Sequence, residues 1–107
     1  MTVSVTGRPE FINKCNCSYC TKLGATWAYY APEDVAVADG GLESFVRADL
    51  DQPFIRMFRC ATCGCATHWT LLAKHPTPKI GVNAQLFEPS DIEAVETRHP
   101  DGRNWER

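Results

Sequence analysis

The stretch CNCSYC (15–20) is the strongest chemical signal in the sequence, because it places three cysteines within six residues. Residues i and i+2 of a strand project to the same face, so we expect Cys15 and Cys17 to direct two sulfurs at one point. Cys20 is expected to join them after a tight turn. Three converging thiolates suit Zn²⁺, which prefers sulfur ligands at about 2.3 Å and four ligands in a tetrahedron. The fourth position is open to substrate in a catalytic site and closed by a protein ligand in a structural one.

A second cluster, CATCGC (60–65), has the outline of a zinc knuckle in Cys60-x-x-Cys63-Gly64. Gly64 supplies the residue that accepts a positive φ in such a turn. Redox dithiols share the Cys-x-x-Cys spacing, but a thioredoxin-type site lies between a strand and a helix, whereas β-like segments flank this cluster. The pattern therefore favours a metal. Whether the two clusters share one metal stays open.

The rest of the chain predicts a mainly antiparallel β fold with little helix. Short β-forming segments alternate with turn signals, and no segment has a long helical period. The 107 residues suit a single domain, residues 1–107, and no linker divides them. A short helical segment is expected within 89–95, and the polar tail 98–107 is expected on the surface. The strands are expected at residues 2–6, 11–15, 26–31, 35–37, 42–46, 54–58, 66–72 and 79–86.

Composition excludes several classes of protein. The net charge of −2 argues against a broad basic surface for nucleic acid. No segment approaches the roughly 18–20 consecutive apolar residues of a membrane span, and none resembles a signal peptide. We therefore expect a cytoplasmic protein with no membrane and no nucleic-acid partner. In such a reducing compartment, clustered cysteines are metal ligands or catalytic thiols more often than disulfides.

Three segments together resemble the glutathione-dependent formaldehyde-activating enzyme family, also called the Gfa or centromere protein V family. They are PEFINKCNCSYCTKLGA (9–25), RMFRCATCG (56–64) and GVNAQLFEP (81–89), and the likeness covers nearly the whole chain. The resemblance implies a Gfa-type fold of coiled antiparallel β hairpins with two zinc sites. It also implies that Cys15, Cys17 and Cys20 hold the catalytic zinc, and that Cys60 and Cys63 are half of a structural zinc site.

The activity that the resemblance implies is the joining of formaldehyde to glutathione, which gives S-(hydroxymethyl)glutathione. This is the chemistry of a carbon–sulfur lyase run in reverse, with a small thiol or thiol adduct as substrate and glutathione as the possible co-substrate. A zinc ion on Cys15, Cys17 and Cys20 would take the thiol sulfur as its fourth ligand and keep it as thiolate. The alternative is a structural zinc-binding module that recognises a protein partner without catalysis, since function belongs to the site rather than to the fold.

The chain departs from the family at the N-terminal cysteines. The family opens with Gly-x-Cys-x-Cys-Gly, whose two cysteines complete the structural site, whereas this chain reads Thr-Val-Ser-Val-Thr over residues 2–6. Three explanations stay open: a start that is shortened relative to relatives, replacement of the missing ligands by Cys65 or His68, or a second site without metal. The sequence gives no indication of oligomeric state.

Other residues with possible site roles have structural interpretations. Trp27, Tyr29 and Tyr30 are predicted to pack in a sheet rather than to form a substrate cage. His68 is expected to be a partly buried, hydrogen-bonded histidine rather than a ligand or proton carrier. For Asn83, a role facing the site and a hydrogen bond at a strand end remain equal alternatives.

Overall fold

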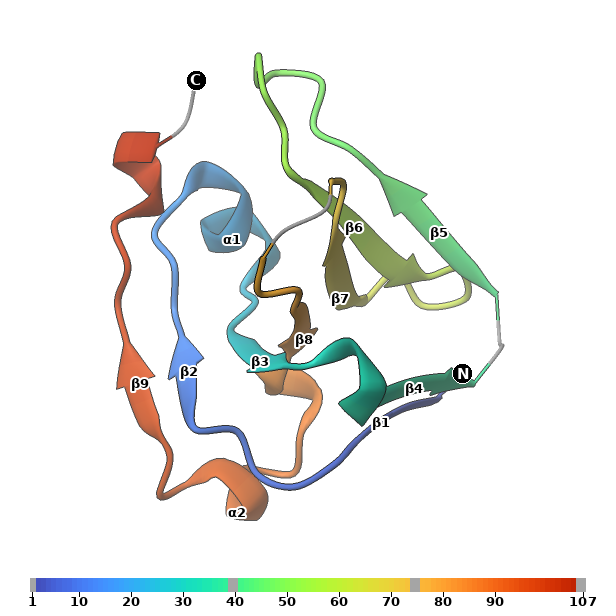
Figure 1. Ribbon diagram of the computed structural model, residues 1–107, viewed down its shortest axis with the longest axis vertical. Coiled ribbons are helices and arrows are strands. Elements are labelled where there is room, and N and C mark those ends of the chain that lie inside the picture. The colour runs from blue at the N-terminus through green and yellow to red at the C-terminus, as the bar shows by residue number, and fades with distance from the viewer. Residues whose placement is uncertain (1, 39–40, 74–75, 106–107) are drawn as a thin grey trace.

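The computed structural model describes residues 2–38, 41–73 and 76–105. It confirms a mainly β fold, in which a curved seven-stranded sheet has the order β5-β6-β7-β8-β3-β2-β9 and β1 pairs with β4 in a separate two-stranded ribbon (Figure 1). The strands are β1 Thr2–Val5, β2 Phe11–Asn13, β3 Trp27–Tyr30, β4 Val35–Ala38, β5 Leu42–Phe45, β6 Ile55–Cys60, β7 Ala66–Leu71, β8 Ile80–Asn83 and β9 Glu96–Arg98.

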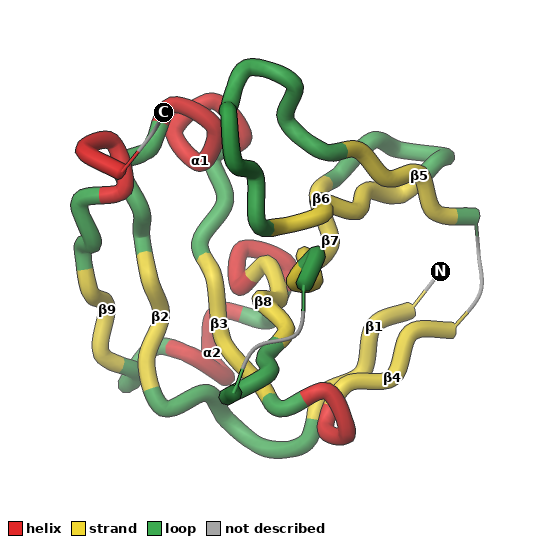
Figure 2. Tube along the Cα trace, turned by 45° about the horizontal axis from the view of Figure 1, so that its top comes forward, coloured by secondary structure: helices red, strands yellow, loops and turns green. Residues whose placement is uncertain are grey.

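All strand pairs are antiparallel except β2 with β9, which run parallel with Asn13 opposite Arg98. The helical elements are short: α1 Ser18–Leu23, α2 Pro89–Ile92, and 3₁₀ turns at Pro32–Asp34, Ala84–Leu86 and Gly102–Trp105. Figure 1 and Figure 2 show α1 close to the 3₁₀ turn Gly102–Trp105, at the same end of the molecule. In the described part of the chain, no helix has the length and apolarity needed to cross a membrane.

Strand β3 separates two hydrophobic clusters, because successive side chains of a strand point to opposite faces. On one face, Ala28 and Tyr30 pack with Ile12 and Val82. On the other, Trp27 packs with Trp69 and other residues beneath α1. The prediction that Trp27 and Tyr30 are packing residues is confirmed, since both are buried. A strand that is covered on both faces explains why large apolar side chains run consecutively through this segment.

The expected strands agree with the structure except that those expected over 11–15 and 79–86 both end early, at Asn13 and at Asn83. The strand expected over 79–86 ends at Asn83, because the Asn83 side chain accepts a hydrogen bond from the Gln85 backbone N–H (3.1 Å) and begins a 3₁₀ turn. The Asn83 amide also donates to the Ala66 carbonyl oxygen (2.9 Å), so this buried residue has the strand-end role. The tail is only partly on the surface, since Gly102 is buried.

Candidate metal centre

The first cysteine cluster forms one group in space. Ligand atoms of Cys15, Cys17 and Cys20 all lie within 4.8 Å of one another. Four thiolates around zinc at about 2.3 Å would place sulfurs roughly 3.8 Å apart, which is within about 1 Å of this limit. Among the residues that the structure describes, no histidine, aspartate or glutamate joins the group. The donor set therefore fits a thiophilic ion such as Zn²⁺ and leaves one position to another ligand.

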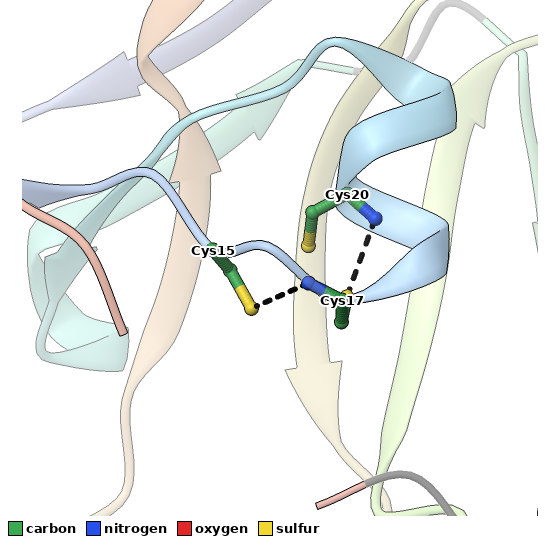
Figure 3. A group of neighbouring side chains, drawn as sticks. All are labelled: Cys15, Cys17 and Cys20. Carbon is green, nitrogen blue, oxygen red and sulfur yellow. Dashed lines mark hydrogen bonds between the residues drawn. The ribbon is translucent and has the colours of Figure 1, made fainter. Parts of the chain in front are cut away.

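The local backbone differs from the predicted strand and turn. Cys15 follows β2 in an extended loop, Cys17 is the N-cap of α1, and Cys20 lies in the first turn of that helix (Figure 3). The expectation that Cys15 and Cys17 lie on a strand is thus wrong. Cys17 has an extended backbone and its sulfur accepts the Cys20 N–H at 3.3 Å, which satisfies one of the free N–H groups at the helix start.

Nitrogen donors surround the sulfurs. The Cys17 backbone N–H donates to the Cys15 sulfur at 3.4 Å, and the Cys20 N–H donates to the Cys17 sulfur. The indole Nε1–H of Trp27 donates to the Cys20 sulfur at 3.3 Å, which links the core to the site. The backbone N–H of Gly102 also hydrogen bonds to Cys15. Donors of this kind favour thiolates over thiols, and they stabilise the excess negative charge of a three-thiolate zinc site.

Burial opposes ionisation of these thiols when no metal is bound. It raises the pKa of Cys15 and raises the pKa of Cys20 strongly, although the Trp27 N–H partly offsets the effect on Cys20. A bound cation reverses this balance, because it replaces the lost solvation and takes the deprotonated sulfur as its ligand. Metal and protons therefore compete for the same sulfurs.

This competition predicts that metal affinity rises steeply with pH. At neutral pH both Cys15 and Cys20 carry protons in the metal-free protein, since the pKa of each is raised, and a metal must displace them. Because at least two protons are displaced, the apparent Kd for zinc is expected to be at least about 100-fold lower at pH 7.5 than at pH 6.5. Competition against a chromophoric chelator, corrected for the chelator's own protonation, measures both values. Equal Kd values at the two pH values would contradict the prediction.

A pocket of about 410 Å³ opens beside the cysteine group, with Cys15 and Cys20 in its wall. Its other walls come from the loop between the cysteines, from the end of α1 and from the segment after β9. The polar side chains that line it are Lys14, Asn16, Thr21, Thr26, Gln85 and His99. None of these residues was predicted from the sequence to belong to the site. Lys14 and Asn16 flank Cys15 in the sequence, which was the available signal, whereas only the fold brings Gln85 and His99 to the site.

The second cluster lies apart from the first, in the hairpin between β6 and β7. The Gly64 N–H donates to the Cys60 carbonyl oxygen (2.8 Å), and Gly64 has the expected positive φ of 78°. Backbone N–H groups of Cys63 and Thr62 lower the pKa of Cys60, while a hydrogen bond with the Cys63 thiol raises the pKa of Cys65. In the described part of the chain these cysteines do not join the first group. A metal on Cys60 and Cys63 stays a prediction.

His68 has a structural environment. It is buried, its ring stacks on Phe58 with centroids 4.6 Å apart, and its Nδ1 lies 2.9 Å from the Thr67 hydroxyl. Burial lowers the pKa of His68, which favours the neutral imidazole. The expected hydrogen bond is present, and the side chain is buried rather than partly buried.

Among known proteins, the chain has a match in fold but none in family or in curated function. No protein-family model matches the chain, and no curated protein matches it. The chain is similar to the crystal structure of a Rhodobacter sphaeroides protein, a structural genomics target, with 24% sequence identity over 90% of each chain and a TM-score of 0.64. At this identity the likeness concerns the fold alone.

Proposed function

We propose that this chain is a zinc-dependent enzyme of the carbon–sulfur lyase type, that it belongs to the glutathione-dependent formaldehyde-activating family, and that it acts on the adduct of a small thiol and an aldehyde. The observation that carries the proposal is the pocket beside Cys15 and Cys20. A purely structural zinc site has four protein ligands and needs no adjoining cavity. Here the described residues supply three ligands, and two of them, Cys15 and Cys20, line a cavity of about 410 Å³ that could admit a small thiol.

Cys15, Cys17 and Cys20 would hold the zinc, which would keep a substrate sulfur as thiolate near neutral pH. Three thiolates place net negative charge on the site, which favours the holding of a thiol over strong polarisation of an aldehyde oxygen. The N–H donors of Cys17, Cys20 and Trp27 limit that charge and fix the orientation of the sulfurs. These backbone and indole groups are in place before any ligand arrives, so the site is preorganised.

The pocket residues would bind the rest of the thiol substrate. Lys14 supplies a cation for a carboxylate, and the side chains of Gln85 and Thr21 supply hydrogen-bonding groups for a peptide backbone. In the reaction, the thiol sulfur bonds to the aldehyde carbon, the π electron pair of the carbonyl moves to its oxygen, and that oxygen takes up one proton as the thiol loses one. The reverse reaction breaks the same carbon–sulfur bond and releases thiol and aldehyde.

The proposal is tested with zinc-loaded protein, glutathione and formaldehyde. The exchange rate between free glutathione and S-(hydroxymethyl)glutathione is measured by NMR exchange spectroscopy, with the metal-free protein as control. We expect the zinc-loaded protein to accelerate exchange in both directions at an unchanged equilibrium constant. The proposal of an enzyme would be refuted if zinc-loaded protein left the exchange rate at its uncatalysed value, both for glutathione and for a panel of other small thiols. X-ray absorption that shows four protein ligands would instead support the structural module.

Lys14 offers a prediction on substrate binding. Replacement of Lys14 by alanine is expected to raise KM for glutathione about tenfold with little change in kcat, because one charge-assisted hydrogen bond contributes about 1.5 kcal/mol. Lys22 is the matched control: it is an exposed lysine in the last turn of α1 and does not line the pocket. Steady-state kinetics of both variants provide the comparison. Equal KM values for Lys14→Ala and Lys22→Ala would remove Lys14 from the substrate site.

A further inference from the structure

Residues 98–104, here called the C-terminal segment, run alongside the loop that carries Cys15 and Cys17. The parallel pairing of β2 with β9 brings Arg98 opposite Asn13. Beyond the strands the pairing continues, since the Lys14 N–H donates to the Arg98 carbonyl oxygen at 2.8 Å and the Asn16 N–H donates to the Pro100 carbonyl oxygen at 3.4 Å. The cysteine loop is therefore held by a part of the chain about 85 residues away in sequence.

Asn16, the residue between the two cysteines, makes most of the remaining connections. Its side-chain Nδ2 donates to Asp101 Oδ1 at 2.8 Å, and its Oδ1 accepts the Arg103 backbone N–H at 3.0 Å. The Arg103 Nε donates to the Asn16 carbonyl oxygen at 3.2 Å. These bonds attach Asp101 and Arg103, the two sequence neighbours of Gly102, to the cysteine loop.

Gly102 itself contacts the metal centre. A Cβ atom at this position would lie 2.4 Å from the Cys15 sulfur and 3.2 Å from the Cys17 Cβ. The backbone N–H of Gly102 hydrogen bonds to Cys15. Gly102 is not among the glycines with positive φ, so its need for glycine comes from close approach rather than from backbone conformation. Gly7 is the opposite case, with φ of 80° and no atom within 4 Å of a Cβ.

We infer that Gly102 is a positioning residue of the metal centre, which fixes the Cys15 sulfur by contact and by its backbone N–H, and that Asn16 holds Gly102 in place. The inference rests on the metal site of the proposed function but not on the proposed reaction. The same segment supplies His99 and Pro100 to the pocket wall. The C-terminal segment thereby links the position of one zinc ligand to the shape of the pocket.

Chelator competition on the Gly102→Ala protein measures its zinc Kd against that of wild type. Because the new methyl group displaces the Cys15 sulfur, we expect the Kd to rise by about 10- to 100-fold, as for other residues that orient a metal ligand. Gly7→Ala is the matched control, since Gly7 lies at the opposite end of β2 from Cys15 and its replacement strains the backbone without touching the cysteines. It is expected to lower the melting temperature and leave the Kd unchanged.

Asn16→Ala gives a second test without any steric clash. It removes the two side-chain bonds to Asp101 and Arg103, so the Kd is expected to rise several-fold. In metal-free protein, both Asn16→Ala and Gly102→Ala are expected to speed alkylation of Cys15 by iodoacetamide, which mass spectrometry follows residue by residue. This readout needs neither metal nor activity.

Different results would refute the proposed reaction and the role of Gly102. Wild-type protein that binds zinc but catalyses no thiol–aldehyde exchange refutes the proposed reaction and leaves the role of Gly102 intact. The inference is overturned if both Gly102→Ala and Asn16→Ala have the zinc Kd and the Cys15 alkylation rate of wild type. This conclusion holds whether or not the protein catalyses thiol–aldehyde exchange. Circular dichroism confirms that each variant retains its β structure before these values are compared.

Discussion

Replacement of Cys17 by alanine is expected to remove about one zinc per chain and to reduce thiol–aldehyde exchange to the uncatalysed rate. Two remaining thiolates, Cys15 and Cys20, cannot hold the ion against competing chelators, because each thiolate supplies a large part of the binding free energy. Elemental analysis of protein purified without added metal measures the loss. Wild-type protein with no zinc and no free thiols would contradict the metal site and the enzyme built on it.

The structure supplies a sharper version of this experiment. Since the Cys17 sulfur also caps α1, alanine removes a ligand and a helix cap at once, and the cap alone contributes about 1 kcal/mol. Cys17→Ser keeps a favoured capping side chain and removes the thiolate. It is expected to lose zinc as Cys17→Ala does while the metal-free protein stays closer to wild-type stability. Cys63→Ala is the control at the second cluster. Zinc that is lost in this variant but kept in Cys17→Ser is assigned to Cys60 and Cys63.

The largest effect on stability is expected for Trp69→Ala. Trp69 is 6% exposed, its ring forms T-shaped contacts with the rings of Trp27 and Tyr29, and it covers the backbone of Gly81 on the neighbouring strand. Removing a buried indole costs the transfer free energy of the ring and leaves a cavity. The free energy of unfolding is therefore expected to fall by about 3–5 kcal/mol, against a total of roughly 5–15 kcal/mol for a domain of this size.

Urea denaturation of metal-free protein measures this change, with Phe54→Ala as the matched control. Phe54 is also aromatic but 63% exposed, so its removal is expected to change the free energy of unfolding by less than about 0.5 kcal/mol. Similar effects for the two variants would show that Trp69 is not part of the stabilising core. Gly81→Ala is expected to be destabilising as well, since its Cβ would lie 2.2 Å from the Trp69 ring.

Local patterns in the sequence were sufficient to predict most strands. Alternation and turn residues located β1, β3, β4, β5, β6 and β7 to within about two residues of their observed bounds. The three-cysteine group was also predictable, because six residues of chain can hardly keep three sulfurs far apart. The parallel pair β2 with β9 was not predictable, since it joins segments more than 80 residues apart and carries no local signal.

A mainly β fold and a thiolate group at residues 15–20 were predictable, because both follow from short-range spacing along the chain. The way in which that group is built depends on long-range contacts. Cys17 begins a helix, Trp27 reaches Cys20 from the core, and Gly102 approaches Cys15 from the other end of the chain. The tail looked like a solvated surface because its residues are polar. Its role depends on contacts that exist only after the sheet has formed, and such contacts leave no pattern of spacing in the sequence.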